Sequence, residues 1–405
     1  MLCRLSDWRK KHFYRGQTDR PRVLHVITGL HVGGAENFLY RLLSTFDHEC
    51  LKHAVACFKW GPVAQKIGAL GVPVHQVSRV FYRNDYLGEF VKNWKPDVIH
   101  ASEWTANVLA RSLKKDQPKI PIVCALHSNP DYHGFIRNFF ERWMPLPDKF
   151  VAVSRGVVEG YERNIVAHLG NDAAKSFRDR LKVIENGINI DYYAQPSGGA
   201  VSLRRELGIP PHAFVVGAVG RMVPIKAYDH LIDSFSFFLK SVNGNAHLVF
   251  VGEGPERARL ESYVENLGLG AWVHFVGLQR DLLQWYAMFD ALGISSRGEG
   301  LSMALLEALS SGIPIVTTKT GDGHEVIEDR KNGLLTEVGD TAEFSEALGR
   351  LYRGGKSLRR EYAAVNIELL RSRFDIECCA QRYQELYASL LDRVPVVQTR
   401  DQFIG

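Results

Sequence analysis

Short runs of apolar and β-branched residues alternate along the chain with longer amphipathic segments. In the first half, runs that predict buried strands occupy 22–28, 54–58, 97–100, 122–126 and 150–153, with helices such as 35–45 between them. A second series predicts strands at 214–219, 247–251, 273–276, 291–294 and 315–317. Strands that are apolar throughout and separated by helices are typical of parallel sheets covered on both faces. The pattern therefore predicts an α/β protein with two doubly wound, Rossmann-like domains.

A break in this pattern divides the chain. Pro, Ser and a pair of Gly interrupt any period within 191–201. We expect a basic tail over 1–21, one domain over 22–192, a second over 193–373, and a C-terminal segment over 374–405. The helical stretch 376–391 in that last segment lies beyond the second strand series, so it could return to pack on the first domain. A length of 405 residues agrees with two domains, because one core rarely organises so long a chain.

The composition is that of an ordinary globular protein, with 45% hydrophobic and 23% charged residues. No apolar run reaches the roughly 18 residues that a membrane-spanning helix needs. The first twenty residues lack the apolar core of a secretory signal. The six cysteines show neither CxxC spacing nor a disulfide framework, which favours a reducing compartment. These features predict a cytoplasmic protein.

The net charge of +5 is concentrated at the N-terminus. Residues 1–22 hold seven Arg or Lys and two Asp, a surplus of five, so the rest of the chain is neutral. A neutral body argues against a nucleic-acid partner. The tail also carries Trp8, Phe13 and Tyr14, and it could bind an anionic surface at the inner face of the cytoplasmic membrane. The alternative is a solvated tail without a partner.

Two glycine-rich loops each follow a predicted strand. In the segment 29–36, Gly33 and Gly34 open a helix, where a backbone without side chains and exposed amides can bind a phosphate or a sugar hydroxyl. Neither this loop nor 252–255 has the GxGxxG spacing of dinucleotide enzymes. A plain tight turn remains the alternative for both.

Arg221 and Lys226 follow the first strand of the second series. The carboxyl end of a parallel strand is where ligands bind in such sheets. A guanidinium can bind two phosphate oxygens and an ammonium adds a point charge, so the pair suits a diphosphate. The alternative is that both side chains are only solvated.

One glutamate precedes a predicted helix over 301–311, and a second lies within it. Eight residues of helix would separate Glu299 from Glu307 by about 12 Å, whereas the two carboxylates of glycosidases lie roughly 5 to 9.5 Å apart. The pair would therefore hold different parts of an elongated ligand, Glu307 a ribose diol and Glu299 a transferred sugar. Phosphate oxygens could bind the amides at the helix start, those of Leu301, Ser302 and Met303.

These segments together resemble glycosyltransferase family 4 over about residues 22–390. The specific part is 299–314, followed by Glu325 and 332–334, and the supporting segments are 29–36, 151–154, 183–189, 220–226, 252–255 and 275–277. The resemblance implies a GT-B fold, in which two Rossmann-like domains face a cleft. It also implies a nucleotide-diphosphate sugar as the donor substrate, no cofactor, no obligatory metal, and retention of configuration at the anomeric carbon.

The resemblance carries roles onto matching positions. Arg221 and Lys226 would bind the diphosphate, Glu307 the ribose and Glu299 the donor-sugar hydroxyls. His127 matches the family's histidine beside the donor sugar, whereas without the resemblance a packed structural histidine would be favoured. The implied catalytic residues are His127, Glu299, Arg221 and Lys226, and the acceptor hydroxyl would attack the same face that the leaving phosphate departs from.

Three positions depart from the commonest family pattern. Ala227 stands where glycine is usual, which concerns the geometry of a turn. The pair 301–302 replaces a frequent Phe-Gly, and Asp322 stands in a stretch that is often all glycine, so both concern the donor sugar. None of the three removes a charged group that the chemistry needs.

The resemblance favours a metal-independent hexosyltransferase that extends a glycan or a lipid-linked acceptor in bacterial cell-surface polysaccharide biosynthesis. One alternative is a sugar-nucleotide epimerase or a phosphorylase with the same fold. Another is a catalytically silent scaffold in a polysaccharide-assembly complex. The sequence leaves the sugar, the nucleotide and the acceptor open.

Overall fold

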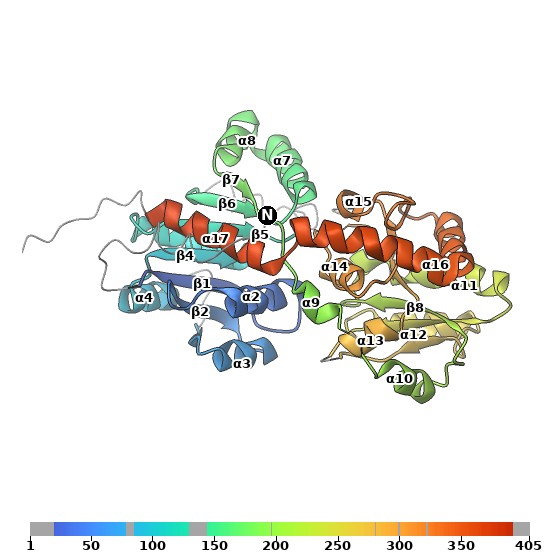
Figure 1. The fold of residues 1–405 in the computed structure, drawn as a ribbon. Helices are drawn as coiled ribbons and strands as arrows, with labels where there is room; N and C mark the ends of the chain where they lie inside the picture. Colours follow the sequence, from blue (N-terminus) through green and yellow to red (C-terminus); the bar gives the residue numbers. More distant parts are fainter. Residues whose placement is uncertain are drawn as a thin grey trace, which may run out of the picture.

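The computed structural model describes residues 20–77, 85–128, 144–195, 197–279, 281–298, 300–320 and 323–391. Two parallel sheets lie side by side in this part of the chain (Figure 1). The α/β class with two Rossmann-like domains, predicted from the alternation of strands and helices, is confirmed. Nearly all of the tail expected over 1–21 lies outside the described residues, and so do Glu299 and Asp322.

The first sheet has the strand order β3-β2-β1-β4-β5-β6-β7, with every neighbouring pair parallel. Its strands are β1 Arg22–Gly29, β2 Lys52–Lys59, β3 Val74–Gln76, β4 Val98–Ser102, β5 Ile122–Leu126, β6 Lys149–Ala152 and β7 Leu181–Val183. Its helices are α2 Gly34–Thr45, α3 Pro62–Ala69, α4 Asp85–Trp94, α5 Trp104–Ser112, the short η1 Leu113–Lys115, α7 Arg155–Leu169 and α8 Asn171–Arg178.

Side chains alternate between the two faces along each strand of the first sheet, and helices bury both faces. Val23 and Ile27 of β1 join the core beneath α2, α3 and the C-terminal helix α17. Leu24 and Val26 point to the opposite face, where α4, α5, α7 and α8 cover the sheet. Burial on both faces explains why the inner strands are apolar at nearly every position.

The second sheet has the order β10-β9-β8-β11-β12-β13, again parallel throughout. Its strands are β8 Phe214–Val219, β9 Ala246–Val251, β10 Val273–Phe275, β11 Ala291–Ile294, β12 Ile315–Thr318 and β13 Leu334–Thr336. The other elements are α9 Ile190–Tyr193, α10 Ala200–Glu206, η3 Pro224–Lys226, α11 Tyr228–Ser241, α12 Arg257–Asn266, α13 Leu283–Met288, α14 Met303–Ser310, α15 Gly323–Val326 and α16 Thr341–Arg373. Helices α11, α12 and α16 cover one face of the sheet, and α10, α13 and α14 cover the other.

The strand order reverses at β1 in the first sheet and at β8 in the second. The next two strands in sequence lie on one side of each of these strands, and the later strands lie on its other side. Ligands of doubly wound sheets bind outside the carboxyl ends of the strands at this switch point. We therefore expect a ligand to bind at the loops that follow β1 and β4, and at those that follow β8 and β11.

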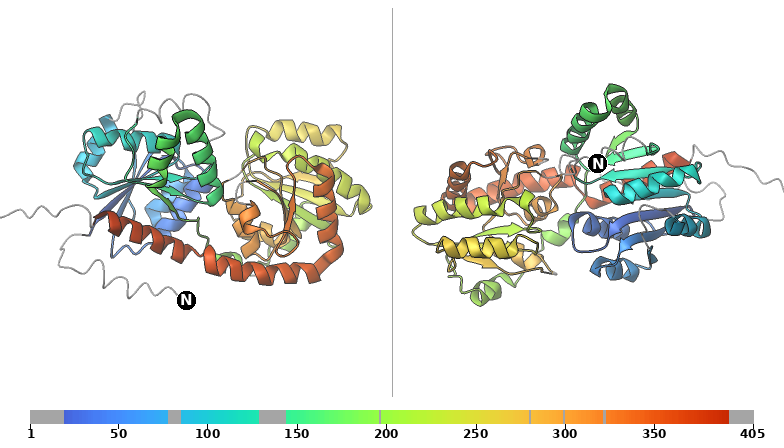
Figure 2. Two further views of the ribbon diagram at one scale, coloured as in Figure 1. Left: turned by 90° about the horizontal axis from the view of Figure 1, so that it is seen from above. Right: turned by 180° about the vertical axis from the view of Figure 1, so that it is seen from behind.

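The chain crosses between the two sheets twice, and the two crossings lie side by side. The amide of Ile188 donates to the carbonyl of Phe374 at 2.8 Å, and the amide of Ile376 donates to the carbonyl of Ile188 at 3.1 Å. A Cβ on Gly187 would lie 2.6 Å from the Cα of Ile376, so a side chain at 187 would force the crossings apart. After the second crossing, α17 Ile376–Leu391 runs along the first domain and packs against α2 and β4 (Figure 2).

Strands β5, β8 and β11 and helix α17 have the bounds that the sequence pattern predicts. The pattern gives no signal for β3, β7 and β13, which are three residues long and lie at sheet edges. An edge strand has fewer buried positions, so it lacks a continuous apolar run. Within the described ranges, no helix combines the length and apolar character needed to cross a membrane.

Candidate active site

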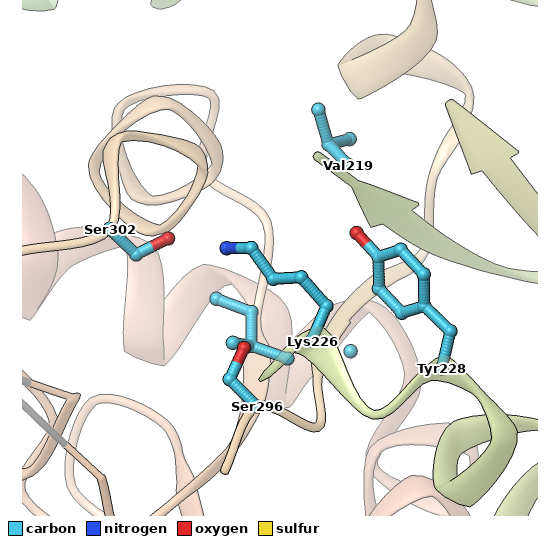
Figure 3. A pocket seen from close by; sticks show the side chains of 7 residues that line it. Val219, Lys226, Tyr228, Ser296 and Ser302 are labelled. Carbon is cyan, nitrogen blue, oxygen red and sulfur yellow. The ribbon is translucent and has the colours of Figure 1, made fainter. Parts of the chain in front are cut away.

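A pocket lies where β8 and β11 end. It is lined by residues of both strands and of the loops that follow them: Val219, Lys226, Tyr228, Gly293, Ile294, Ser296 and Ser302. The Lys226 side chain extends toward the Ser302 hydroxyl, with Tyr228 on its other side (Figure 3). The pocket encloses about 200 Å³, including its open mouth. The pocket is small, so a ligand that reaches Lys226 would lie partly outside it.

The backbone around Lys226 is fixed by the neighbouring loop. The Ser295 hydroxyl donates to the carbonyls of Lys226 and Ala227, at 2.9 and 3.0 Å. The Arg297 amide donates to the Ile225 carbonyl at 2.8 Å. Ala227 adopts the left-handed conformation, with φ 47° and ψ 47°, so alanine makes here the turn for which glycine is usual. The departure noted at this position therefore leaves the turn in place.

The glycine-rich loop 252–255 packs against the loop that follows β8, at 220–222. A Cβ on Gly252, whose φ is 143°, would lie 2.0 Å from the Gly220 carbonyl oxygen, and one on Gly254 would lie 2.2 Å from that of Met222. The Met222 amide donates to the Glu253 carbonyl at 2.9 Å. Both glycines are therefore required by the close approach of two backbones, which favours the structural interpretation of this segment.

Helix α14 begins beside the pocket. Ser302 is its N-cap residue, and its side chain makes no capping hydrogen bond. Met303 is the first helical residue, whereas Leu301 is 7% exposed and joins the core. The amide groups at a helix start carry partial positive charge and attract anions. This end of α14 and the Lys226 ammonium are thus two positive groups at the same pocket.

The first domain presents a glycine loop and two carboxyl groups at the ends of β1 and β4. Gly33 is the N-cap of α2, and a Cβ on Gly33 would lie 2.4 Å from an oxygen of Glu36. Gly34 has open space beside it. Burial, together with the nearby carboxylate of Glu103, raises the pKa of Glu36 to about 7, and the charge of Arg221 opposes that rise. Because Arg221 belongs to the second domain, its charge acts across the boundary between the domains.

His127 follows β5 and is half-buried, with both ring nitrogens buried. Burial lowers the pKa of its imidazole to about 4, so the ring is neutral at physiological pH. Neither ring nitrogen has a hydrogen-bond partner within the described part of the chain. Phe38 of α2 lies edge-on to the ring, with the centroids 5.9 Å apart. An imidazole with two buried, unpartnered nitrogens has spare capacity for hydrogen bonds to a ligand.

Glu307 lies on α14 and is 5% exposed. One of its oxygens accepts a hydrogen bond from Arg41, which lies on α2 of the first domain, and the other accepts one from the Tyr286 hydroxyl at 2.7 Å. Arg41 also donates to the Tyr193 hydroxyl at 2.8 Å. Burial disfavours the charged form of Arg41, but the adjacent Glu307 carboxylate raises its pKa above the ordinary value.

The structure brings Lys226 and Ser302 together at one pocket, with Met303 directly after Ser302. Glu307 lies on the same helix as Met303, but its partners are Arg41 and Tyr286. Glu299 lies outside the described residues. Sequence reasoning missed Arg41, Tyr286 and Tyr228. A polar or aromatic residue within a helix carries no local signal that it meets a partner from another domain. Among the described residues, no group of three or more His, Cys, Asp or Glu could hold a metal ion.

Two family descriptions match successive parts of the chain. Residues 32–192 match "Glycosyltransferase Family 4", and residues 213–354 match "Glycosyl transferases group 1". The chain belongs to glycosyltransferase family 4. The first matched range begins after β1 and covers the rest of the first sheet, and the second covers the whole second sheet, so the resemblance based on the paired glutamates and the glycine loops is confirmed.

Relatives of this glycosyltransferase include enzymes named for lipopolysaccharide synthesis. It is 27% identical over 375 residues to the lipopolysaccharide core biosynthesis glycosyltransferase LpsD of Rhizobium meliloti, which covers 90% of this chain and 98% of LpsD. It is 31% identical over 186 residues to LpsE of the same organism, which covers 46% of this chain and 53% of LpsE. Family 4 membership therefore rests on similarity in both domains.

Solved structures confirm the GT-B fold. Anabaena HepE in complex with UDP-glucose superposes with a TM-score of 0.78 at 22% identity, covering 91% of this chain and 99% of HepE. The predicted arrangement of two Rossmann-like domains is thus the fold that this family 4 glycosyltransferase adopts.

Proposed function

We propose that this glycosyltransferase moves a sugar from a nucleotide-diphosphate sugar to a glycan or lipid-linked acceptor, with retention of configuration. The observation that carries the proposal is the convergence of the Lys226 ammonium and the start of α14 on one pocket at the switch point of the second sheet. Two positive groups at the carboxyl ends of parallel strands suit the diphosphate of a sugar donor. The complexes of Anabaena HepE with UDP and with UDP-glucose make UDP-sugars the first donors to test.

Sugar transfer depends more on stabilising the charge of the leaving diphosphate than on general acid or base catalysis by a side chain. Cleaving the bond between the sugar and the diphosphate leaves negative charge on the leaving group, while positive charge develops at the anomeric carbon. Lys226, Arg221 and the amides of Ser302 and Met303 would stabilise the leaving diphosphate. His127 and Glu299 would hold the sugar, and Glu307 the ribose. The acceptor hydroxyl then attacks the face that the phosphate leaves, and its proton passes to a phosphate oxygen.

The backbone near Gly33 and Gly34 would contribute to the diphosphate site from the first domain. Gly34 has open space where a side chain would stand, and α2 begins there without a side-chain cap at Gly33. A helix start from each domain would then face the donor. This arrangement needs no metal ion, because fixed cationic groups and helix amides supply the positive charge.

Similarity to LpsD over 98% of that relative supports a role in bacterial cell-surface polysaccharide biosynthesis. A lipid-linked acceptor would lie at the inner face of the cytoplasmic membrane, and residues 1–22 could hold the enzyme there. The first domain, which carries the half-buried Glu36 and Glu103 after β1 and β4, would bind the acceptor.

A panel of nucleotide sugars and nucleoside diphosphates tests the proposal. A bound donor should raise the melting temperature by mass action, by an amount that grows with its concentration. The donor that stabilises the chain most is then assayed for slow hydrolysis and for transfer to lipid-linked glycans, with and without excess EDTA. We expect both reactions to persist in EDTA. Loss of all activity on chelation, restored by manganese, would show that the enzyme needs a metal.

The same panel separates the alternatives. Conversion of the nucleotide sugar to its epimer, or its formation from a glycan and phosphate, would identify an epimerase or a phosphorylase. Binding of nucleotide sugars without hydrolysis or transfer would indicate a silent scaffold. No stabilisation by any nucleotide sugar or nucleoside diphosphate would overturn the proposed function.

A further inference from the structure

A cluster of four side chains joins the two domains through Glu307. Arg41 comes from α2 of the first domain, Tyr193 from the linker helix α9, and Tyr286 from α13 of the second domain. Tyr286 is 0% exposed and Tyr193 is 6% exposed. The Arg41 guanidinium also lies over the Tyr193 ring, 5.6 Å from its centroid, and the two tyrosine rings meet edge to face at 5.9 Å. The cluster therefore packs densely at the interface.

The hydrogen bonds leave room on the carboxylate. An ionised carboxylate has about four lone-pair sites. Arg41 and Tyr286 use one site on each oxygen, and the Tyr193 hydroxyl, which accepts from Arg41, is also hydrogen-bonded to Glu307. About one site remains for a hydroxyl donor of a ribose. A ribose hydroxyl could thus bind Glu307 without displacing a protein partner.

The ion pair between Arg41 and Glu307 also compensates the cost of burying the carboxylate. A carboxylate that is 5% exposed is costly to keep ionised without a countercharge. Tyr286 supplies a hydrogen bond but no charge, so the charge that compensates Glu307 comes from Arg41. Arg41 is seven residues beyond Gly34, which places it about 10 Å along α2 from the glycine loop. One helix of the first domain thus carries both the loop and the partner of Glu307.

We propose that Arg41 is a positioning residue for nucleotide recognition: its ion pair holds the Glu307 carboxylate in the orientation that the ribose needs. This inference rests on the proposed function, because it takes Glu307 as the ribose ligand. It adds that the ribose site is complete only when α2 of the first domain lies against α14 of the second. The nucleotide is then recognised by the two domains together, although its direct ligands lie in one.

The test compares two ligands that differ only in the ribose. Binding of the nucleoside diphosphate that stabilises the wild-type chain most, among UDP, GDP and ADP, is measured by calorimetry beside its 2′,3′-dideoxy analogue. The variants are Arg41→Met, which keeps the unbranched apolar stem without the charge, and Tyr286→Phe. Arg178→Met is the matched control, because Arg178 pairs with Glu162 on the surface of the same domain.

We expect the wild-type chain to bind the dideoxy analogue at least ~10-fold more weakly, as for the loss of hydrogen bonds to a charged group. Arg41→Met should weaken binding of the natural nucleotide at least ~10-fold and leave the dideoxy analogue within about twofold. Tyr286→Phe should show the same pattern with a smaller effect, and Arg178→Met should show none.

Other results overturn the inference. Equal losses for both ligands in Arg41→Met would assign Arg41 to domain packing alone. Unchanged or tighter binding of the natural nucleotide would show that the pair does not prepare Glu307 for ribose. If no nucleoside diphosphate binds the wild-type chain, the proposed function fails and the inference fails with it, an outcome distinct from the other two.

Discussion

The backbone carbonyl of His127 faces Gly300 across the boundary between the two domains. A Cβ built on Gly300 would lie 2.5 Å from that oxygen, closer than real atoms approach, and 3.5 Å from a methyl carbon of Val157. His127 follows β5 of the first sheet, whereas Gly300 lies three residues before the first residue of α14. The absence of a side chain at 300 thus allows the first domain to contact the loop that leads into the pocket.

Gly300→Ala should lower turnover by about tenfold or more with little change in melting temperature. The added methyl group must push the loop away from His127, and small displacements of reacting groups are costly to catalysis. The measurement is steady-state transfer together with thermal unfolding. Gly270→Ala is the control, because a Cβ there meets no atom within 4 Å. Normal turnover in Gly300→Ala would mean that this close contact does not matter for the reaction.

Arg221→Ala and Lys226→Ala should each lower turnover by at least ~100-fold while the fold stays intact, because each removes positive charge from the leaving diphosphate. Lys226 lines the pocket, and Arg221 is exposed at the domain boundary. The measurement is turnover at saturating donor with purified variants. Lys240→Ala, at the far end of α11, is the control for loss of a lysine. Unchanged kinetics in both variants would reject the diphosphate site.

Three buried histidines lie beneath α17. His25 and His53 share a hydrogen bond at 3.1 Å, and His100 pairs with the Tyr387 hydroxyl at 2.7 Å. Burial, with the charge of neighbouring histidines, lowers the pKa of His53 and of His100 to about 3, and lowers that of His25 as well. In the unfolded chain these groups titrate near ~6.5.

The free energy of unfolding should therefore decrease as the pH falls below ~6.5, because the unfolded chain binds protons that the folded chain refuses. Each such histidine contributes a slope of up to ~1.4 kcal/mol per pH unit. Urea unfolding at pH 7.5, 6 and 5 measures it. His53→Phe should reduce the dependence of the unfolding free energy on pH by up to ~1.4 kcal/mol per pH unit. His212→Gln, at an exposed position, should leave this dependence unchanged. Identical slopes for all three proteins would refute this origin of acid sensitivity.

Residues 1–20 should contribute weak, salt-sensitive binding to anionic membranes. Each basic residue near such a surface adds at most ~1 kcal/mol. Co-sedimentation with anionic liposomes compares the full chain with a chain that starts at Pro21, at low and high salt. We expect the shorter chain to remain in the supernatant. Equal binding by both would move the membrane contact to the folded domains.

The sequence by itself determined the two sheets. Continuous apolar runs that alternate with amphipathic segments are typical of parallel sheets covered on both faces, so the positions of β8, β9 and β11 along the chain could be predicted locally. Arg221 and Lys226 could be proposed as ligand-binding residues because they lie in the loop after β8. The rule that ligands gather at the carboxyl ends of such strands needs no knowledge of distant contacts.

Only the tertiary structure decided which partners these residues meet. Arg41 and Glu307 are 266 positions apart, and Arg41 alone looks like a solvated residue of an amphipathic helix. The need for glycine at 187 and 300 arises from the backbones of Ile376 and His127, which no local pattern places nearby. Contacts between such distant positions depend on how the chain crosses twice between the domains. That path is set by the packing of whole elements rather than by the residues at the contact.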